Sequence, residues 1–177
     1  TEEIIQQVSE AAKLGVNMVH LHARDPETEE PTHKKEVYSE IISGIRKHHK
    51  NLIIGVSTSG RVFNDFQKRS ECLELTGDAK PDFASLTLSS LNFNNQASIN
   101  SPEMIQRLAA KMLDSGIKPE LEAFDLGMIN YAKYLIHKGL IKAPYYFNLI
   151  LGNIACAQPN MLNLGLMINE LPESSIW

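Results

Sequence analysis

Two histidines separated by a single residue are the part of this sequence best suited to chemistry. His20 and His22 stand at the end of the apolar run Val16 to Leu21, and a turn-forming Arg-Asp-Pro segment follows closely. Alternate side chains of a strand share a face and lie about 6.6 Å apart along it, so both imidazoles can reach one ion. The pair is therefore either half of a metal site at a strand end or two partly buried histidines bonded to the backbone.

Paired carboxylates form the second candidate group. Glu120 and Glu122 alternate with Leu121 on a predicted strand, so both carboxylates point to the same side of the sheet. Burying paired acids is costly, which favours a functional role over a structural one. Glu122, nearer the strand end, is the first candidate for a metal ligand, a general base or a holder of a substrate ammonium, and Glu120 is the second. The alternative is an edge strand with a solvated face. Asp125, in the following turn, is predicted to cap a helix.

Hydroxyl-rich segments end two other predicted strands. Ser57-Thr58-Ser59-Gly60 and Thr87-Leu88-Ser89-Ser90 each lead into a loop. Hydroxyls beside exposed backbone N–H groups suit a carboxylate or a phosphate. Neither segment has the GxxxxGK[ST] spacing of a phosphate-binding loop, and the sequence contains no GxGxxG. Taken alone, such segments are more often turns with capping residues.

Composition narrows the class of protein. The chain has 177 residues, 43% of them hydrophobic, and a formal net charge of -4. These values indicate a soluble, globular, cytoplasmic protein with no basic surface for nucleic acid or an anionic membrane. No stretch approaches the roughly 18 consecutive apolar residues of a membrane span, and the acidic start argues against a secretory signal. Cys72 and Cys156 are far apart and are expected to be reduced thiols.

The elements that must position these side chains alternate regularly. Apolar periodicity predicts five strands and six helices, beginning and ending on a helix. The strands fall at 16–22, 52–56, 83–88, 120–124 and 145–151, and the helices at 4–14, 37–48, 68–75, 102–115, 128–138 and 160–169. Such alternation predicts a parallel sheet in a single α/β domain over residues 1–177. The aromatic run 145–147 is interpreted as core. The polar loops follow strands, where parallel α/β proteins build active sites.

The predicted strand count leaves the sheet incomplete. The leading helix has no strand before it, and five strands are too few to close an eight-stranded barrel. Exposed parallel edges at both sides would be a liability for a free-standing sheet. Either the sheet is open, or the sequence belongs to a larger domain.

Four motifs taken together are far more specific than any one of them. They are Val19-His20-Leu21-His22-Ala23-Arg24-Asp25-Pro26, Ser57-Thr58-Ser59-Gly60, the run from Ala84 to Phe93 and the run from Lys118 to Gly127. In order and spacing they resemble the β-keto acid cleavage enzymes, the family of the 3-keto-5-aminohexanoate cleavage enzyme. The resemblance covers essentially the whole chain.

This resemblance implies a (β/α)8 barrel, of the TIM type, that binds one divalent metal, usually Zn2+. It implies an acyltransferase that condenses a small-molecule β-keto acid with acetyl-CoA, giving acetoacetate and a new acyl-CoA. The residues that match the family's functional positions are His20 and His22 as metal ligands, Glu122 or, failing that, Glu120 as the catalytic glutamate, Ser57 and Gly60 in the loop that holds the substrate carboxylate, and Thr87 and Ser89 as further substrate contacts.

The resemblance also implies what lies outside this sequence. Relatives have a strand before Thr1 and two more βα units after Trp177, which carry a glutamate as third metal ligand, an aspartate base and an arginine. We therefore expect a partial barrel that is inactive alone, and Ser59 stands where many relatives have glycine. Relatives are tetramers, which favours a homo-oligomer. Two alternatives stay open: a truncated, non-catalytic paralogue acting as a binding or assembly subunit, and a metal-dependent aldolase or hydrolase on the same barrel.

Overall fold

Six parallel strands form the main sheet of the protein, which a computed structural model describes over all residues 1–177. Along the sheet they follow chain order, β1–β2–β3–β6–β7–β8. Their bounds are β1 (Met18–Leu21), β2 (Ile53–Val56), β3 (Phe83–Thr87), β6 (Lys118–Ala123), β7 (Tyr145–Leu149) and β8 (Ser175–Ile176). Two short strands, β4 (Leu91–Asn92) and β5 (Ala97–Ser98), form a separate antiparallel hairpin in the loop after β3.

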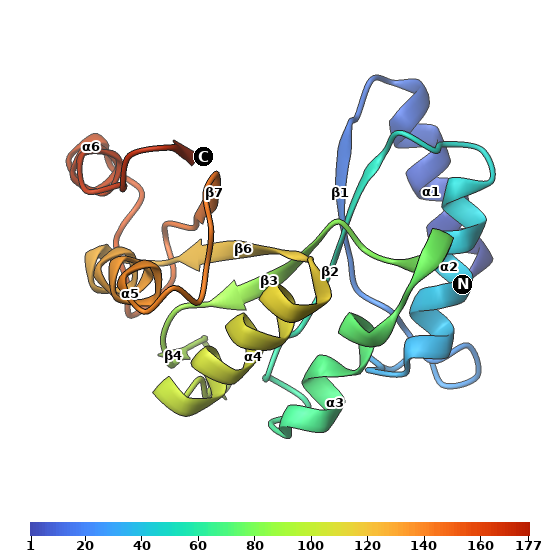
Figure 1. Ribbon diagram of the computed structural model, residues 1–177, viewed down its shortest axis with the longest axis horizontal. Helices are drawn as coiled ribbons and strands as arrows, with labels where there is room; N and C mark the ends of the chain where they lie inside the picture. Colours follow the sequence, from blue (N-terminus) through green and yellow to red (C-terminus); the bar gives the residue numbers. More distant parts are fainter.

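Helices alternate with the strands of the main sheet and cover its outer side. They are α1 (Glu2–Lys13), α2 (Lys35–Arg46), α3 (Phe66–Ser70), α4 (Pro102–Ser115), α5 (Leu126–His137) and α6 (Met161–Asn169). Figure 1 shows them as an arc around the strands, from α1 and α2 through α3 and α4 to α5 and α6. This arrangement confirms the predicted α/β class and corresponds to part of a (β/α)8 barrel. None of these helices has the length and apolar character needed to cross a membrane.

The structure differs from the sequence-based prediction in three elements. The main sheet has six strands instead of five, because β8 adds two residues at the edge beside β7. A strand of two residues is too short to produce a periodic pattern. The helix predicted at 68–75 divides into α3 and a 3-10 helix at Glu71–Glu74, and a second 3-10 turn follows at Gly77–Ala79. The loop predicted after β3 contains the β4–β5 hairpin.

Local sequence signals set the ends of the longer helices. Ser101 caps α4, since its hydroxyl accepts a hydrogen bond from Met104 N at 3.2 Å, and Pro102 occupies the first turn. The same helix ends at Gly116, whose φ of 62° is the left-handed conformation that favours glycine. Asp125 caps α5 as predicted, accepting from Met128 N at 3.0 Å.

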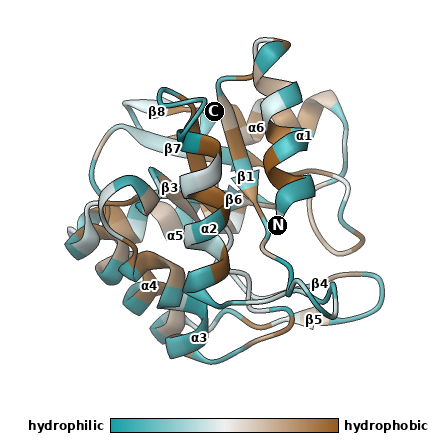
Figure 2. Ribbon diagram, turned by 90° about the vertical axis from the view of Figure 1, so that its right-hand side faces the viewer, coloured by the Kyte–Doolittle hydropathy of each residue, from teal (hydrophilic) through white to brown (hydrophobic).

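The two faces of the sheet differ in character. The outer face is apolar, and its fully buried side chains pack against α2, α4 and α5; the strand residues concerned are Ile54, Leu86, Leu121 and Phe147. Figure 2 shows hydrophobic colours along the central strands, whereas the outward turns of α3 are mainly hydrophilic. The inner face carries most of the polar side chains near the carboxyl ends of the strands. The helices therefore cover the outer face of the sheet, and the inner face can form a functional site.

An aromatic ring fills the space beside a glycine on the inner face. A Cβ atom on Gly55 of β2 would lie 2.1 Å from the ring of Phe83 on β3. This ring also makes edge contacts with His20 and Tyr146, at centroid distances of 6.4 and 5.7 Å. Tyr146, expected in the core, is therefore half-buried on the inner face, whereas its neighbour Phe147 is in the core.

Candidate active site

His20 and the two carboxylates of β6 converge on the inner face. Ligand atoms of His20, Glu120 and Glu122 all lie within 4.8 Å of one another. The parallel register pairs Glu120 with Ser85 of β3 and with Tyr146 of β7, so these side chains share one face. The three residues thus form a group that could hold a metal ion.

A hydrogen-bonded chain crosses the sheet through Glu120. His20 Nδ1 lies 2.7 Å from Glu120 Oε2, and Asn148 Nδ2 donates to Glu120 Oε1 at 2.9 Å. Because a carboxylate only accepts, Nδ1 of His20 carries the proton of this bond. Burial acts to lower the pKa of His20, but the hydrogen bond and the charge of Glu120, together with the charge of Glu122, raise it overall. Glu120 is only 2% exposed, and both of its oxygens have partners.

His22 lies beside this group and faces the solvent more openly. Its ring stacks on that of His20, with centroids 5.0 Å apart and planes inclined by 29°. Partial desolvation by the surrounding protein lowers the pKa of His22 to about 4, with the charges of His20 and Arg61 acting in the same direction. The imidazole is therefore neutral near pH 7 and has a free nitrogen lone pair.

Glu122 is held by a hydroxyl of the neighbouring strand. Thr87 Oγ1 donates to Glu122 Oε2 at 2.5 Å, and the two residues are paired in register across β3 and β6. Burial raises the pKa of Glu122, and the nearby charge of Glu120 adds to this effect, whereas the bond from Thr87 opposes it. No donor of the chain bonds to the second oxygen, Oε1.

A buried arginine supports the loop after β2. Arg69 Nε donates to Thr58 O at 2.8 Å, and Nη2 donates to Asn100 Oδ1 at 2.7 Å. A Cβ atom on Gly60 would lie 2.6 Å from Arg69 Nη1, so the loop passes directly over the guanidinium. Arg69 is 4% exposed and forms no ion pair, and burial lowers its pKa to about 10. The guanidinium therefore keeps its charge near pH 7.

A cavity of about 200 Å³ lies over these side chains. It is lined by residues from β3, β6 and the loops after β1, β2, β3, β6 and β7, among them His22, Ser57, Thr87 and Glu122. The cavity thus brings together four of the sequence-based candidates. Gly60 and Ser89 are outside the lining: Gly60 is the part of its loop that packs on Arg69, and the Ser89 carbonyl accepts from Asn100 Nδ2 at 3.0 Å.

Three residues of the site were not predicted from the sequence. Asn148 follows the aromatic run 145–147 that is interpreted as core, and as a polar residue within the apolar stretch from Tyr145 to Leu151 it is a usable signal. Ser85 joins β3 to the loop after β2, since Thr58 N donates to its Oγ at 2.9 Å and Thr58 Oγ1 donates to its carbonyl at 2.6 Å. Arg69 lay in a predicted helix, where a charged residue is usually solvated.

The fold and the site define a class before any family is considered: a partial (β/α)8 barrel with a histidine–carboxylate group at the carboxyl ends of its strands. The family model described as beta-keto acid cleavage enzyme matches residues 1–177. The chain belongs to this family, which confirms the resemblance carried by the four motifs.

Individual relatives support the same assignment. The chain is 33% identical over 177 residues to a 3-keto-5-aminohexanoate cleavage enzyme from Fusobacterium nucleatum, covering 99% of this chain and 62% of the relative. It is 35% identical over 150 residues to a 3-oxoadipate:acetyl-CoA acetyltransferase from Cupriavidus necator, covering 85% of this chain and 51% of the relative. The chain thus spans between about half and two thirds of the length of these two relatives.

A solved structure supports the fold. The ternary complex of ObcA with a C4-CoA adduct and oxalate superposes with a TM-score of 0.77 at 22% identity, over 86% of this chain and 36% of that one. At this identity the similarity concerns architecture alone.

Proposed function

We propose that the whole protein is a metal-dependent acyltransferase that converts a β-keto acid and acetyl-CoA into acetoacetate and a new acyl-CoA. A bond forms between C2 of the keto acid and the acetyl carbonyl carbon, and the bond between C2 and the ketone carbon breaks. The bond between the acetyl carbonyl carbon and the CoA sulfur also breaks, and the released acyl group passes to that sulfur, so two bonds form, two bonds break, and atoms and electrons balance. The observation that carries this proposal is the hydrogen-bonded group of His20, Glu120 and Asn148 beside the cavity, in a chain of this family.

The side chains present fit a divalent metal. His20 uses Nδ1 for Glu120, which leaves Nε2 for an ion, and a carboxylate behind a ligating histidine is a common feature of metal sites. His22 adds a neutral imidazole, and this donor set of imidazoles and carboxylates suits Zn2+. When bound, such a metal supplies Lewis-acid polarisation of the substrate ketone. In this proposal His20 and His22 hold the metal, and Glu120 acts as a positioning residue.

Glu122 is the residue proposed to handle the proton at C2. Thr87 holds Oε2, so Oε1 stays available to accept a proton from the substrate methylene. Ser57 lines the cavity and accepts from Ser59 N at 3.2 Å, which leaves its hydroxyl hydrogen for the substrate carboxylate. Gly60, packed on Arg69, keeps this loop close to a buried positive charge that favours an anion. Ser89 contributes through its carbonyl, which holds Asn100.

The remaining features of the proposal concern the assembly. We treat residues 1–177 as one partial barrel domain, since a single continuous core of helices and sheet runs through them. Family resemblance supports a homo-oligomer, with tetramers as the expected state. Light scattering on the intact protein measures this directly.

Two histidine variants of the intact protein test the metal assignment. His20→Ala and His22→Ala should each abolish both stoichiometric zinc and acetoacetate formation from acetyl-CoA and a β-keto acid. His137→Ala, at the end of α5, is the matched control and should keep both. Zinc is measured by atomic emission and acetoacetate by an enzymatic assay. Stoichiometric zinc in the double variant His20→Ala/His22→Ala would contradict the assignment.

A conservative variant separates positioning from catalysis. Glu120→Gln should weaken zinc affinity roughly 10- to 100-fold, because it loses the charge that orients His20. Glu122→Gln should keep zinc and lose turnover. Competition with a chromogenic chelator gives the affinities, and equal zinc loss in both variants would refute the division of roles.

A further inference from the structure

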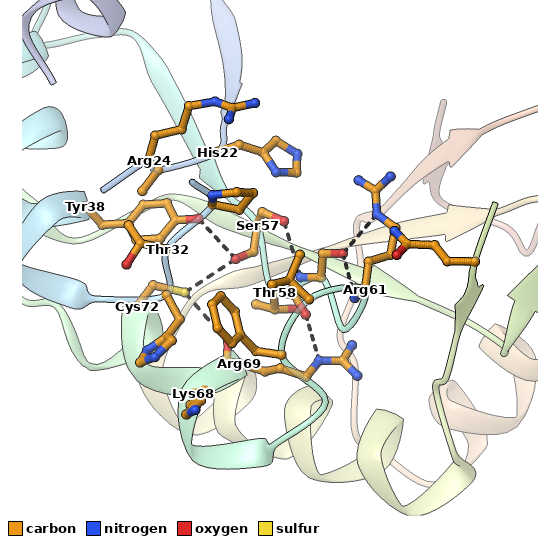
Figure 3. A pocket seen from close by; sticks show the side chains of 17 residues that line it. His22, Arg24, Thr32, Tyr38, Ser57, Thr58, Arg61, Lys68, Arg69 and Cys72 are labelled. Carbon is orange, nitrogen blue, oxygen red and sulfur yellow. Dashed lines mark hydrogen bonds between the residues drawn. The ribbon is translucent and has the colours of Figure 1, made fainter. Parts of the chain in front are cut away.

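A second cavity, of about 480 Å³, adjoins the first and shares lining residues with it. Figure 3 shows this second cavity from close by. We call it the basic cavity, because its 17 lining residues include four permanent cations and no aspartate or glutamate. The cations are Arg24, Arg61, Lys68 and Arg69. Figure 3 shows Arg24 and His22 on one side of the cavity and Lys68 and Arg69 on the other. The positive charge is thus concentrated in this cavity, whereas the chain as a whole has a net charge of -4.

These cations have no carboxylate partners. None of the four takes part in any of the ion pairs of the protein, which join other residues. Arg24 donates to the carbonyl of Glu29 at 2.7 Å, and Lys68 Nζ lies 5.4 Å from the centroid of the Phe63 ring. The nearby carboxylate of Glu71 is bonded to His33 at 2.7 Å. The charge of the cavity is therefore available to an anionic ligand.

The two cavities share a wall. His22, Ser57, Ser59 and Arg61 line both of them, so a ligand in the basic cavity reaches the reacting groups past His22. The smaller cavity, over Glu122 and Thr87, has room for a short keto acid. The larger one lies in the size range of ligand pockets. A reaction with two substrates needs such a pair of adjoining spaces.

We propose that the basic cavity binds the phosphate-bearing nucleotide end of the CoA thioester, with the thioester arm directed past His22. This inference rests on the proposed function. Phosphate groups are bound by arginine and lysine side chains through charge-assisted hydrogen bonds, and arginine matches their geometry in a bidentate manner. Arg24 and Lys68, on opposite sides of the cavity, contact separate phosphates, and Arg69 adds charge from beneath the loop.

Equilibrium binding of coenzyme A to the intact, metal-free protein tests the site without turnover. Arg24→Ala/Lys68→Ala should weaken binding of coenzyme A by at least about tenfold, the loss expected for one charge-assisted phosphate bond. The same variant should bind pantetheine, which has no phosphate, as the unmodified protein does. Lys47→Ala/Lys50→Ala removes the same charge beyond the end of α2, outside the cavity, and should leave both affinities unchanged. Calorimetry provides all of these values.

A labelling experiment on the unmodified protein avoids any effect of substitution on folding. Coenzyme A should slow the reaction of Lys68 with an amine-reactive reagent and leave Lys47 unaffected, as measured by mass spectrometry. Unchanged coenzyme A affinity in the Arg24→Ala/Lys68→Ala variant, or unprotected Lys68, would overturn the site even if acetoacetate is formed. Protection of Lys68 in a protein that forms no acetoacetate would instead support the site and refute the proposed reaction.

Discussion

At Gly55, the space that a side chain would occupy is filled by the ring of a neighbouring residue. The ring of Phe83 occupies the space where its Cβ would lie, at 2.1 Å, and Phe83 is only 3% exposed. The obstacle is the outer edge of a rigid, buried ring, formed by its Cε2 and Cζ atoms, so the whole ring has to shift. Such overpacking costs about 1–3 kcal/mol in protein interiors.

The first prediction concerns this packing. Gly55→Ala should lower the free energy of unfolding by about 1–3 kcal/mol, measured by urea denaturation. Adding Phe83→Leu should recover part of the loss, because the smaller side chain frees the space. Gly165→Ala is the matched control: its Cβ meets nothing within 4 Å inside α6, so it should stabilise the protein by about 0.5–1 kcal/mol. Equal effects at both glycines would contradict the packing argument.

For single residues, the sequence indicates on which face of a strand a side chain lies but not which other side chain it contacts. The period of a strand correctly places Glu120 and Glu122 on one side of β6. Which of them contacts His20 depends on the register of the four neighbouring strands β1, β2, β3 and β6. The register pairs His20 with Gly55, and Glu120 with Ser85, so the contact of His20 with Glu120 is set by the tilt of the strands across the sheet. A single sequence contains no information on that tilt.

The ends of helices and strands can be predicted from the sequence where a local interaction sets them. Asp125 was assigned to the cap of α5 from its position alone, and its carboxylate accepts from Met128 N at 3.0 Å. In contrast, β8 depends on pairing with β7, and the β4–β5 hairpin depends on contacts across its own loop. The caps Ser101 and Asn160, like Asp125, accept from the backbone N–H group three positions along the chain. Long-range pairing is absent from local patterns.

The second prediction concerns α5, the helix that follows Glu122. Asp125→Ala should lower the free energy of unfolding by about 1 kcal/mol, because the backbone N–H of Met128 loses its acceptor. Asp125→Asn should restore most of this stability, since the amide oxygen accepts the same bond. Urea denaturation compares the three proteins. If Asp125→Asn is as unstable as Asp125→Ala, then charge and not the cap is responsible.

At the scale of the whole molecule, alternating periodicity is enough to predict a parallel sheet in an α/β domain. The partial barrel came from the motifs and not from the periodicity, because alternation alone fits both open and closed sheets. The cavities could not be predicted, since each is built from loops after several different strands. Loop conformations depend on packing against residues elsewhere in the chain. The packing of Gly60 on the Arg69 guanidinium is an example.

The third prediction uses the accessibility of the two cysteine thiols to distinguish the native protein from the unfolded protein. Both cysteines are free, Cys72 is 2% exposed and Cys156 is half-buried. Burial raises the pKa of Cys72 to about 12, so the thiol stays protonated and shielded at pH 8. A thiol reagent should modify Cys156 in the native protein and Cys72 only on unfolding, which absorbance of the released chromophore measures. Rapid native labelling of Cys72 would show that the core opens locally around it.

The sign of the pH effect follows from the same thiol. Its ordinary pKa is 9.0, below the folded value of about 12, so the unfolded chain releases this proton first as the pH rises. Cys72 therefore lowers stability progressively between about pH 9 and pH 12 and has no such effect below that range. Cys72→Ala should flatten the decline in unfolding free energy over this interval.

The pairing of Gly55 with Phe83 also constrains how this family can diverge. Because ring and backbone occupy adjoining positions on β2 and β3, neither residue can change in size without the other. We expect the two positions to covary among relatives: a residue larger than glycine at the first should accompany a smaller side chain at the second. A change there also moves the ring that contacts His20. We therefore expect substitutions at these two positions to accompany changes in the site around His20.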